Sequence, residues 1–272
     1  MDFFPYSCYH NSKIYFFNWR YMMQKITILD IPFDNVTKKE APELAFSRIY
    51  AKKKTVVVTP NAEIAQMSAE DESVKRAVCC ADIILPDGEG VVLASKKLGT
   101  PLHEKVAGVE FGMECARLAA ERGYSLFLLG GKEGVAQKAA SELRKRFPSL
   151  KIAGVRNGYF DRGSEENDQV LTQINESGAD ILFVCLGAPA QEKWAAENRD
   201  KLLPVLICCL GGSLDIYSGN AKRAPKLFIK LRLEWFWRLI KEPTRLGRMM
   251  KLPKFLHTVN KYKKLQKRGT KC

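Results

Sequence analysis

The chain contains 272 residues with a hydrophobic fraction of 46% and four tryptophans, a composition that excludes an intrinsically disordered protein. Its length suits one α/β domain with an appendage, with two small domains as the alternative. The formal net charge of +14 comes from one part of the chain. Residues 220–272 hold 17 lysines and arginines against two glutamates, whereas the other residues hold 27 basic and 28 acidic side chains. A nearly neutral body, residues 25–219, therefore carries a cationic appendage, residues 220–272, which indicates an anionic partner such as a phospholipid leaflet, a diphosphate or nucleic acid.

Residues 1–24 form an N-terminal extension that need not belong to the native protein, with Met22 or Met23 as candidate starts. Polar and charged residues interrupt any apolar segment in it, and no small-residue cleavage site follows, so it does not resemble a signal peptide. The chain also has no apolar run of the roughly 18 to 20 residues that cross a bilayer. We therefore expect any membrane contact to be peripheral.

From Lys25 to residue 219, short β-branched runs alternate with amphipathic stretches, a pattern typical of a parallel sheet with helices on both faces. The predicted strands are 26–29, 55–58, 82–85, 125–129, 151–153, 181–186 and 205–210. The predicted helices lie near 37–50, 61–80, 89–98, 109–122, 132–146, 164–177, 189–200 and 212–217. This order predicts a doubly wound α/β fold, in which ligands bind beyond the carboxyl ends of the strands.

Polar residues and glycines follow five of the predicted strands. The motifs are Thr59-Pro60-Asn61, Pro86-Asp87-Gly88-Glu89-Gly90, Gly130-Gly131, Gly187-Ala188-Pro189-Ala190-Gln191-Glu192 and Gly211-Gly212-Ser213. Folding alone does not require so many polar residues at one edge of a sheet. We therefore expect the functional site at that edge.

Asp87 is the first candidate for a catalytic residue. It ends an apolar strand, and the glycines after it allow backbone and ligand to approach closely. Spacing alone supports equally well an Asp-Gly turn in which Asp87 caps the helix after Gly90. Thr59 and Asn61 at an adjacent strand end favour the functional interpretation.

The Gly130-Gly131 and Gly211-Gly212 turns each join a strand to a helix, where backbone N–H groups can receive a phosphate. Each is a weak signal, because such turns also use glycine for geometry alone. Neither completes GxGxxG and no GxxxxGK[ST] occurs, which argues against a dinucleotide-dependent oxidoreductase and against P-loop proteins. The three histidines are far apart in the sequence and no Asp-x-Asp occurs, so we predict no metal site and no cofactor.

Eight cysteines do not indicate disulfides. Cys79-Cys80 and Cys208-Cys209 are adjacent pairs in apolar runs, where cysteine behaves as a small hydrophobic residue. Reduced thiols fit a cytoplasmic protein.

The appendage combines aromatic and basic residues. Apolar side chains recur at helical spacing from Phe228 to Leu239, with basic side chains opposite, and Pro243 ends this helix. A solvated terminal helix would explain part of the pattern. The excess of basic residues and the Trp235-Phe236-Trp237 run favour an interfacial helix, to which each lysine or arginine near anionic lipid contributes about 1 kcal/mol. Charge alone leaves a nucleic-acid-binding protein with a basic arm as the alternative. We expect truncation after Ser218 to leave a soluble body with little activity.

Together the motifs resemble the WecG/TagA/CpsF family of glycosyltransferases, over residues 26–248. The carrying motifs are Thr59-Pro60-Asn61, Leu85 to Gly90, Lys105-Val106-Ala107-Gly108, Leu128-Leu129-Gly130-Gly131, Gly187 to Glu192, Arg223-Ala224-Pro225, Glu234-Trp235, Arg238-Leu239 and Glu242-Pro243-Thr244-Arg245. Two positions depart from the family pattern. Ala190 stands where the family usually has a basic residue, and Lys105 where it often has arginine.

The resemblance implies a Rossmann-like body whose appendage helps to complete the active site at the inner face of the cell membrane. It implies inverting, metal-independent transfer of an N-acetylmannosamine-type sugar from UDP to undecaprenyl-diphosphate-linked N-acetylglucosamine, in the synthesis of teichoic acid, capsule or exopolysaccharide. The expected partners are thus a UDP-sugar, a lipid-linked acceptor and an anionic membrane surface. No nucleic acid is expected, and homo-oligomerisation is left open.

The same resemblance assigns roles to residues. Asp87 resembles the general base, and Thr59 and Asn61 line the sugar pocket together with Gln191. The appendage arginines that reach the diphosphate correspond to Arg238, Arg245 and Arg248. The predicted binding residues are completed by Gly130, Gly131, Gly187, Gly211 and Gly212.

Overall fold

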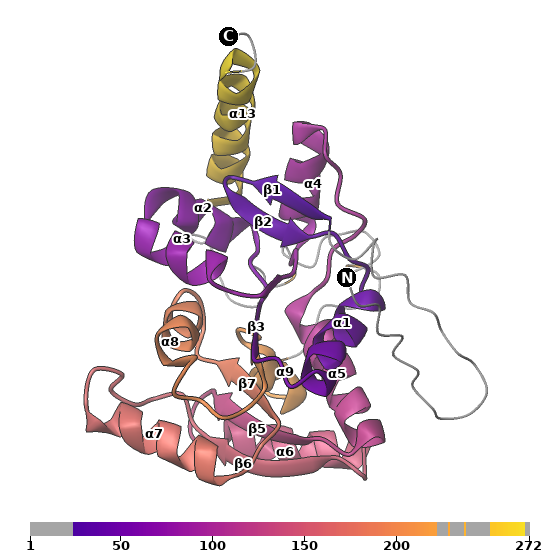
Figure 1. Cartoon of the computed structure of the whole chain (residues 1–272), viewed down its shortest axis with the longest axis vertical. Helices are drawn as coiled ribbons and strands as arrows, with labels where there is room; N and C mark the ends of the chain where they lie inside the picture. The colour runs from indigo at the N-terminus through magenta and orange to yellow at the C-terminus, as the bar shows by residue number, and fades with distance from the viewer. Residues whose placement is uncertain (1–23, 222–227, 229–236, 238–250, 270–272) are drawn as a thin grey trace, which may run out of the picture.

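A computed structural model describes residues 24–221, 228, 237 and 251–269. Almost all of the predicted N-terminal extension lies outside the described residues, as do the predicted ligands Arg238, Arg245 and Arg248. The structure is α/β, as the sequence predicts, with six parallel strands between layers of helices (Figure 1).

The six-stranded sheet has the order β4-β3-β8-β7-β5-β6. Its strands are β3 (Thr55–Val58), β4 (Ile83–Ile84), β5 (Ser125–Gly130), β6 (Lys151–Arg156), β7 (Ile181–Cys185) and β8 (Leu206–Cys209). All neighbouring pairs are parallel. Every residue of β7 and β8 is buried, as expected for strands covered on both faces.

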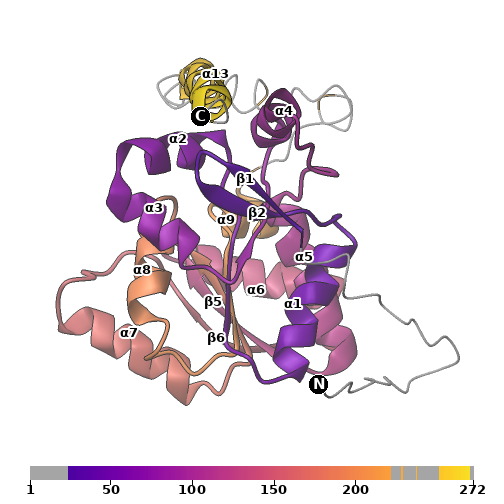
Figure 2. The same ribbon diagram turned by 45° about the horizontal axis from the view of Figure 1, so that its top comes forward.

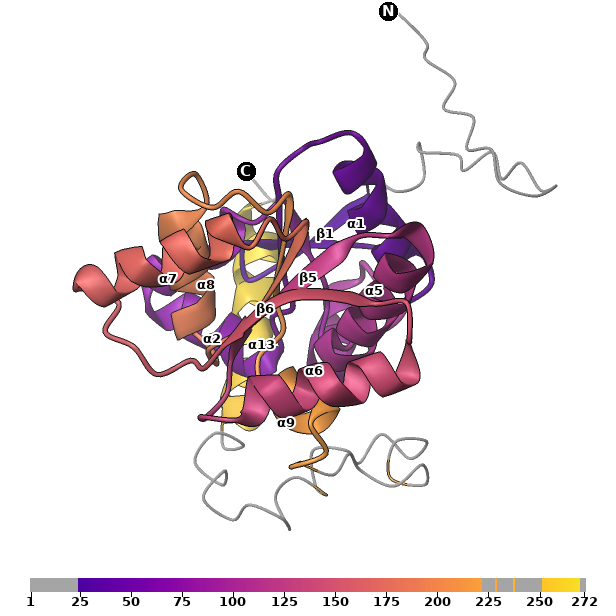
Figure 3. The ribbon, with the colours of Figure 1, turned by 90° about the horizontal axis from the view of Figure 1, so that it is seen from below.

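Two hydrophobic cores lie on opposite faces of this sheet. One face carries α1 (Glu40–Tyr50), α5 (Gly108–Arg122), α6 (Val135–Arg146) and α9 (Ser213–Tyr217). The other carries α2 (Ala62–Glu70), α3 (Glu72–Cys79), α4 (Glu89–Leu98), α7 (Glu165–Glu176), α8 (Ala190–Asn198) and α13 (Lys251–Gly269). The view from below separates α7 and α8 from α5 and α6 across the sheet (Figure 3).

The first predicted strand does not join the parallel sheet. Residues Lys25–Ile28 (β1) pair instead with Ile31–Asp34 (β2) in a separate antiparallel hairpin. Leu29 and Asp30 make the turn with positive φ angles of 49° and 64°, the geometry of a two-residue hairpin loop that usually contains glycine or asparagine. The strand itself was predicted, but its place in the parallel sheet was wrong and its partner strand was missed. Leu29-Asp30 gives no turn signal, and Pro32 argues against a second strand.

The predicted helix 61–80 is interrupted once. Asp71 adopts an extended conformation between α2 and α3, and its carboxylate accepts hydrogen bonds from the backbone N–H groups of Ser73 and Val74. Aspartate is among the preferred N-cap residues, so a helix start lies inside the continuous apolar pattern.

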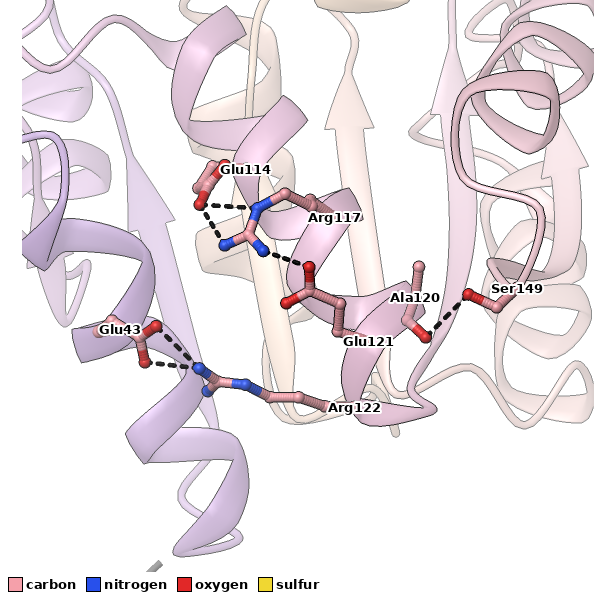
Figure 4. Close-up of polar contacts among 7 residues, drawn as sticks. All are labelled: Glu43, Glu114, Arg117, Ala120, Glu121, Arg122 and Ser149. Atoms are coloured by element: carbon pink, nitrogen blue, oxygen red, sulfur yellow. Dashed lines mark hydrogen bonds and ion pairs between the residues drawn. The ribbon is translucent and has the colours of Figure 1, made fainter. Parts of the chain in front are cut away.

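Polar contacts along α5 fix this helix against its neighbours (Figure 4). Arg122 donates to both carboxylate oxygens of Glu43 on α1, at 2.8 and 2.7 Å. Ser149 donates to the carbonyl of Ala120 at 3.1 Å. Because the carboxyl-terminal half of α5 is held in this way, its N-terminus at Gly108 has a defined position at the edge of the sheet where the strands end.

The last helix, α13, belongs to the packed body. Its Phe255 and Val259 are fully buried in the core that also contains residues of α2 and α4, and it lies beside α2 and α4 in Figures 1 and 2. Tyr262 also donates to Asp30 in the β1–β2 turn at 3.0 Å. Truncation after Ser218 would remove these two core side chains, and the expected soluble body with little activity stays a prediction. Within the part of the chain that the structure describes, α13 and the other helices are not apolar enough to cross a membrane.

Candidate functional site

The sheet order sets the predicted site residues in a row along one edge. Asp87 follows β4, Thr59 follows β3, Gly211 follows β8, Gly187 follows β7 and Gly130 ends β5. The chain leaves β3 towards α2 on one face and leaves β8 towards α9 on the other. A doubly wound sheet binds ligands at such a divergence. Asp87 and Gly130 lie four strand positions apart, roughly 19 Å at about 4.8 Å per strand, so they do not contact the same phosphate.

Asp87 is partly exposed and touches the N-terminus of α5. The backbone N–H of Gly108 donates to its Oδ2 at 3.2 Å, and Asp87 itself donates its backbone N–H to the carbonyl of Pro60 at 3.2 Å. Gly88, which precedes α4, has no side-chain cap, so the interpretation of Asp87 as the cap of that helix is wrong. The free N–H groups and dipole of α5 favour negative charge on the carboxylate.

Thr59 links this carboxylate to the centre of the sheet. Its hydroxyl donates to the carbonyl of Cys209 at 3.2 Å, and its side chain is 7% exposed. A Cβ at Gly108 would lie 2.8 Å from the Thr59 hydroxyl, so only glycine allows α5 to begin this close. Asp87, Gly108 and Thr59 are therefore in contact, as expected from the row of strand ends.

Asn61 lies beside the Asp87 loop and has a structural role. Its Oδ1 accepts the backbone N–H groups of Glu63 and Ile64 at 2.9 and 3.1 Å, which caps α2. A Cβ at Gly88 would lie 3.8 Å from that of Asn61. Its contact with a sugar stays a prediction.

Gln191 is almost completely buried, with 2% of its surface exposed. Its Oε1 accepts the N–H of Gly211 at 2.8 Å, and its Nε2 donates to Oε1 of Glu192 at 2.8 Å. Both ends of the amide thus bind protein groups, and the β8–α9 turn is attached to α8. The predicted role of Gln191 in substrate binding stays untested.

Glu192 is the residue that sequence reasoning missed. It is 1% exposed, and burial raises the pKa of its carboxyl to about 7. In the sequence, a Gln-Glu pair in the first turn of a helix is typical of an exposed polar surface. Only the burial seen in the structure distinguishes Glu192 from an ordinary surface glutamate.

The glycine turns on the other half of the edge are shaped by close packing. Gly130 has a φ of +139°, and a Cβ there would lie 2.3 Å from the carbonyl oxygen of Cys185. The N–H of Gly131 already donates to that carbonyl at 3.4 Å, and its carbonyl accepts the N–H of Gly158 at 2.9 Å. Packing therefore explains these two glycines, and their phosphate contacts stay predictions.

Comparison with known proteins agrees with this geometry. The profile of the Glycosyl transferase WecG/TagA/CpsF family matches residues 26–269. The chain belongs to this family. It is 36% identical over 246 residues to an N-acetylglucosaminyldiphosphoundecaprenol N-acetyl-beta-D-mannosaminyltransferase of Bacillus subtilis (strain 168), covering 90% of this chain and 94% of that protein. Proteins of the same name from Staphylococcus aureus (strain MW2) and Bacillus spizizenii are 32% identical, over 90% of this chain and 96% of the relative, and 35% identical, over 76% and 79%.

As a member of this family the protein is a glycosyltransferase that moves a hexosyl group. The alternative of a nucleic-acid-binding protein receives no support from these relatives. The family match also extends through α13. A Cβ at Gly90 would lie 2.9 Å from Cδ1 of Leu252, and Lys251 pairs with Glu63 at 3.4 Å. In this glycosyltransferase the first turn of α13 therefore packs against α2 and the first turn of α4, the helices that follow Thr59 and Asp87 in the chain.

Proposed function

We propose that this glycosyltransferase moves N-acetylmannosamine from UDP to undecaprenyl-diphosphate-linked N-acetylglucosamine, with inversion and without a metal. The polymer would be teichoic acid, capsule or exopolysaccharide. The observation that carries the proposal is the position of Asp87, which lies at the end of an edge strand beside Thr59 and the N-terminus of α5. The names of the relatives supply the acceptor and the sugar.

Asp87 acts as the general base in this proposal. An acceptor hydroxyl is a weak nucleophile, so a carboxylate within hydrogen-bond reach must take its proton as the new glycosidic bond forms. Oδ2 already accepts the N–H of Gly108, which orients the carboxylate. A single displacement on the opposite side of the sugar ring from UDP then inverts the anomeric configuration.

The leaving UDP gains negative charge that the protein must stabilise. Since the sequence has no Asp-x-Asp pair to hold a metal ion, we assign this role to Arg238, Arg245 and Arg248 together with backbone N–H groups at strand ends. Residues 222–250, which contain these arginines, join Ala221 to Lys251. Both attachment points are fixed, because the N–H of Ala221 donates to the carbonyl of Asp215 at 2.8 Å and Lys251 pairs with Glu63.

The same arrangement fits a protein docked on the inner face of the cell membrane. Residues 251–269 contain no acidic residue, and Lys261 and Lys264 are exposed on α13. Anionic lipid attracts such a helix. The site would then lie close to the membrane that holds a polyprenyl-linked acceptor.

The direct test is transfer by the purified full chain. The protein is incubated with a lipid-diphosphate-linked N-acetylglucosamine and, in parallel, with several UDP-N-acetylhexosamines, and the product disaccharide is identified by mass spectrometry and NMR. We expect a β-linked N-acetylmannosaminyl product, unchanged by EDTA and increased by vesicles that contain phosphatidylglycerol. If a product forms only with another UDP-sugar, the proposed donor sugar is wrong. Loss of activity with EDTA contradicts the metal-independent mechanism. The absence of transfer from any UDP-sugar contradicts the proposed function.

A further inference from the structure

A chain of hydrogen bonds connects α8 to the turn after β8, and a further hydrogen bond connects the end of β8 to the end of β3. Glu192 Oε1 accepts from Gln191, whose Oε1 accepts the N–H of Gly211, both at 2.8 Å. Two residues earlier, the carbonyl of Cys209 accepts the hydroxyl of Thr59 at 3.2 Å. The turn after β8 is thus tied to α8 on one side and to β3 on the other, at the place where the chain diverges to the two faces of the sheet.

Glu192 is the last residue of this series of hydrogen bonds. Its Oε2 is buried and has no hydrogen-bond partner among the described residues, and no described lysine or arginine forms an ion pair with it. An ionised carboxylate with one bare oxygen in an apolar site costs far more free energy than a neutral carboxyl. The neutral acid still offers its carbonyl oxygen to Gln191, so the geometry fits the protonated form.

The elements packed against α8 supply no compensating positive charge at this point. Among the described elements, α3, β3, β7 and β8 lie against α8, and the uncharged Asn167 of α7 is hydrogen-bonded to Trp194 and Asn198 of α8. The titratable side chains of β7 and β8 are thiols, and that of Cys209 donates to the backbone carbonyl of Gln191 at 3.7 Å. The charged contact between α8 and the start of α3, Lys193 with Asp71 at 3.7 Å, lies at the half-exposed rim. Consistent with this environment, burial raises the pKa of Glu192 to about 7.

We propose that Glu192 is a positioning residue for the transfer reaction. In its protonated form it holds the Gln191 amide so that the amide oxygen faces Gly211, and this keeps the β8–α9 turn in the shape that the ligand requires. Ionisation would leave a negative charge on the buried Oε2, which has no hydrogen-bond partner among the described residues. Because burying such a charge is costly, the carboxylate would turn towards water and release Nε2 of Gln191, and the turn would loosen. Turnover therefore has an upper pH limit that Glu192 sets. The proposal rests on the proposed function only in that this turn contacts substrate.

Three variants test the role of Glu192. Glu192→Gln keeps the shape and an acceptor oxygen but cannot ionise, and Glu192→Ala removes the acceptor. Glu197→Gln is the matched control, since Glu197 is an exposed glutamate on the same helix. Turnover is measured from pH 5.5 to 9 with lipid-linked acceptor and the UDP-sugar that wild type uses, and hydrogen–deuterium exchange of residues 206–217 is followed in the protein alone.

We expect wild type and Glu197→Gln to lose turnover above about pH 7 and Glu192→Gln to keep it. Glu192→Ala should lower turnover at every pH by roughly 10- to 100-fold, as small displacements of positioned groups do, with about 5- to 10-fold faster exchange at Gly211. An alkaline fall that persists in Glu192→Gln, or wild-type turnover in Glu192→Ala, overturns the proposal.

The exchange measurement separates this proposal from the proposed function. If wild type transfers no sugar at all, the proposed function fails, and exchange alone then judges the hydrogen-bond chain. The exchange rate at Gly211 is divided by the intrinsic amide exchange rate at each pH, and a ratio that rises between pH 6 and 8 in wild type but not in Glu192→Gln supports the hydrogen-bond chain. Equal exchange in the two proteins overturns it.

Discussion

The two halves of the site edge are built from different chemistry. At β4, β3 and β8, side chains make the contacts: the carboxylate of Asp87 accepts from Gly108 and the hydroxyl of Thr59 donates to Cys209. After β8, the N–H of Gly211 donates to the amide of Gln191, which comes from α8. At β7 and β5, the backbone does so, with Gly131 bonded to the carbonyl of Cys185. Side chains can exchange protons, whereas packed glycines offer only shape and N–H groups. We therefore expect acceptor chemistry at the first half and donor binding towards the second.

The strongest test of this division is Asp87→Asn. Asparagine keeps an oxygen that accepts the N–H of Gly108 but cannot take a proton, so we expect turnover to fall about 1,000-fold with an unchanged unfolding midpoint. UDP binding, measured by calorimetry, should stay within a few fold of wild type. Asp200→Asn on the exposed surface is the control, and near-native turnover of Asp87→Asn would remove this residue from the role of base.

The Phe255→Ala substitution should lower activity by disturbing the packing of α13 near the part of the site formed at β4, β3 and β8. The ring is fully buried between α13, α2 and α4, so its loss is expected to lower the free energy of unfolding by about 3 to 5 kcal/mol. Urea denaturation measures this effect. Because α13 packs against α2 and α4, the helices that follow Thr59 and Asp87, turnover should fall more than UDP affinity in the molecules that stay folded. An exposed residue of the same helix, His257→Ala, should change neither.

Stability should also depend on pH through Glu192. Its folded-state pKa of about 7 lies above the ordinary value of 4.5, so the folded protein holds this proton more tightly than the unfolded chain does. The stability that it contributes is fully present below pH 4.5 and is lost as pH rises through about 7, a change of about 3 kcal/mol. Urea denaturation at several pH values should show this fall in wild type and not in Glu192→Gln. Parallel curves for the two proteins would contradict a raised pKa.

The Gly130→Ala substitution should have the smallest effect of these changes, and it should act on the part of the site formed at β7 and β5. The added Cβ meets the carbonyl of Cys185 at a positive φ, so we expect about 2 kcal/mol of lost stability and weaker UDP binding. Gly187→Ala is the matched comparison, because its φ is +77° but no atom lies within 4 Å of the new Cβ; strain alone should cost roughly 1 kcal/mol. Equal losses in both variants would show that packing at Cys185 is unimportant.

The local sequence pattern determined the class of fold and the position of several site residues. Alternating apolar runs predicted the parallel sheet, and polar residues after strands pointed to Asp87 and Thr59. Those signals are legible because they depend on residues close in sequence, such as a strand and the turn that follows it.

Other features required the tertiary structure. Only the strand order puts Asp87 beside Thr59 and far from Gly130, and only packing buries Glu192 and sets its proton affinity. The Leu29-Asp30 turn was missed because contacts elsewhere in the chain stabilise a backbone that its own residues do not favour. Likewise, α13 reads as a charged terminal helix, but Phe255 and Val259 fill a core supplied by residues almost 200 positions earlier, since burial depends on neighbours that local sequence does not contain.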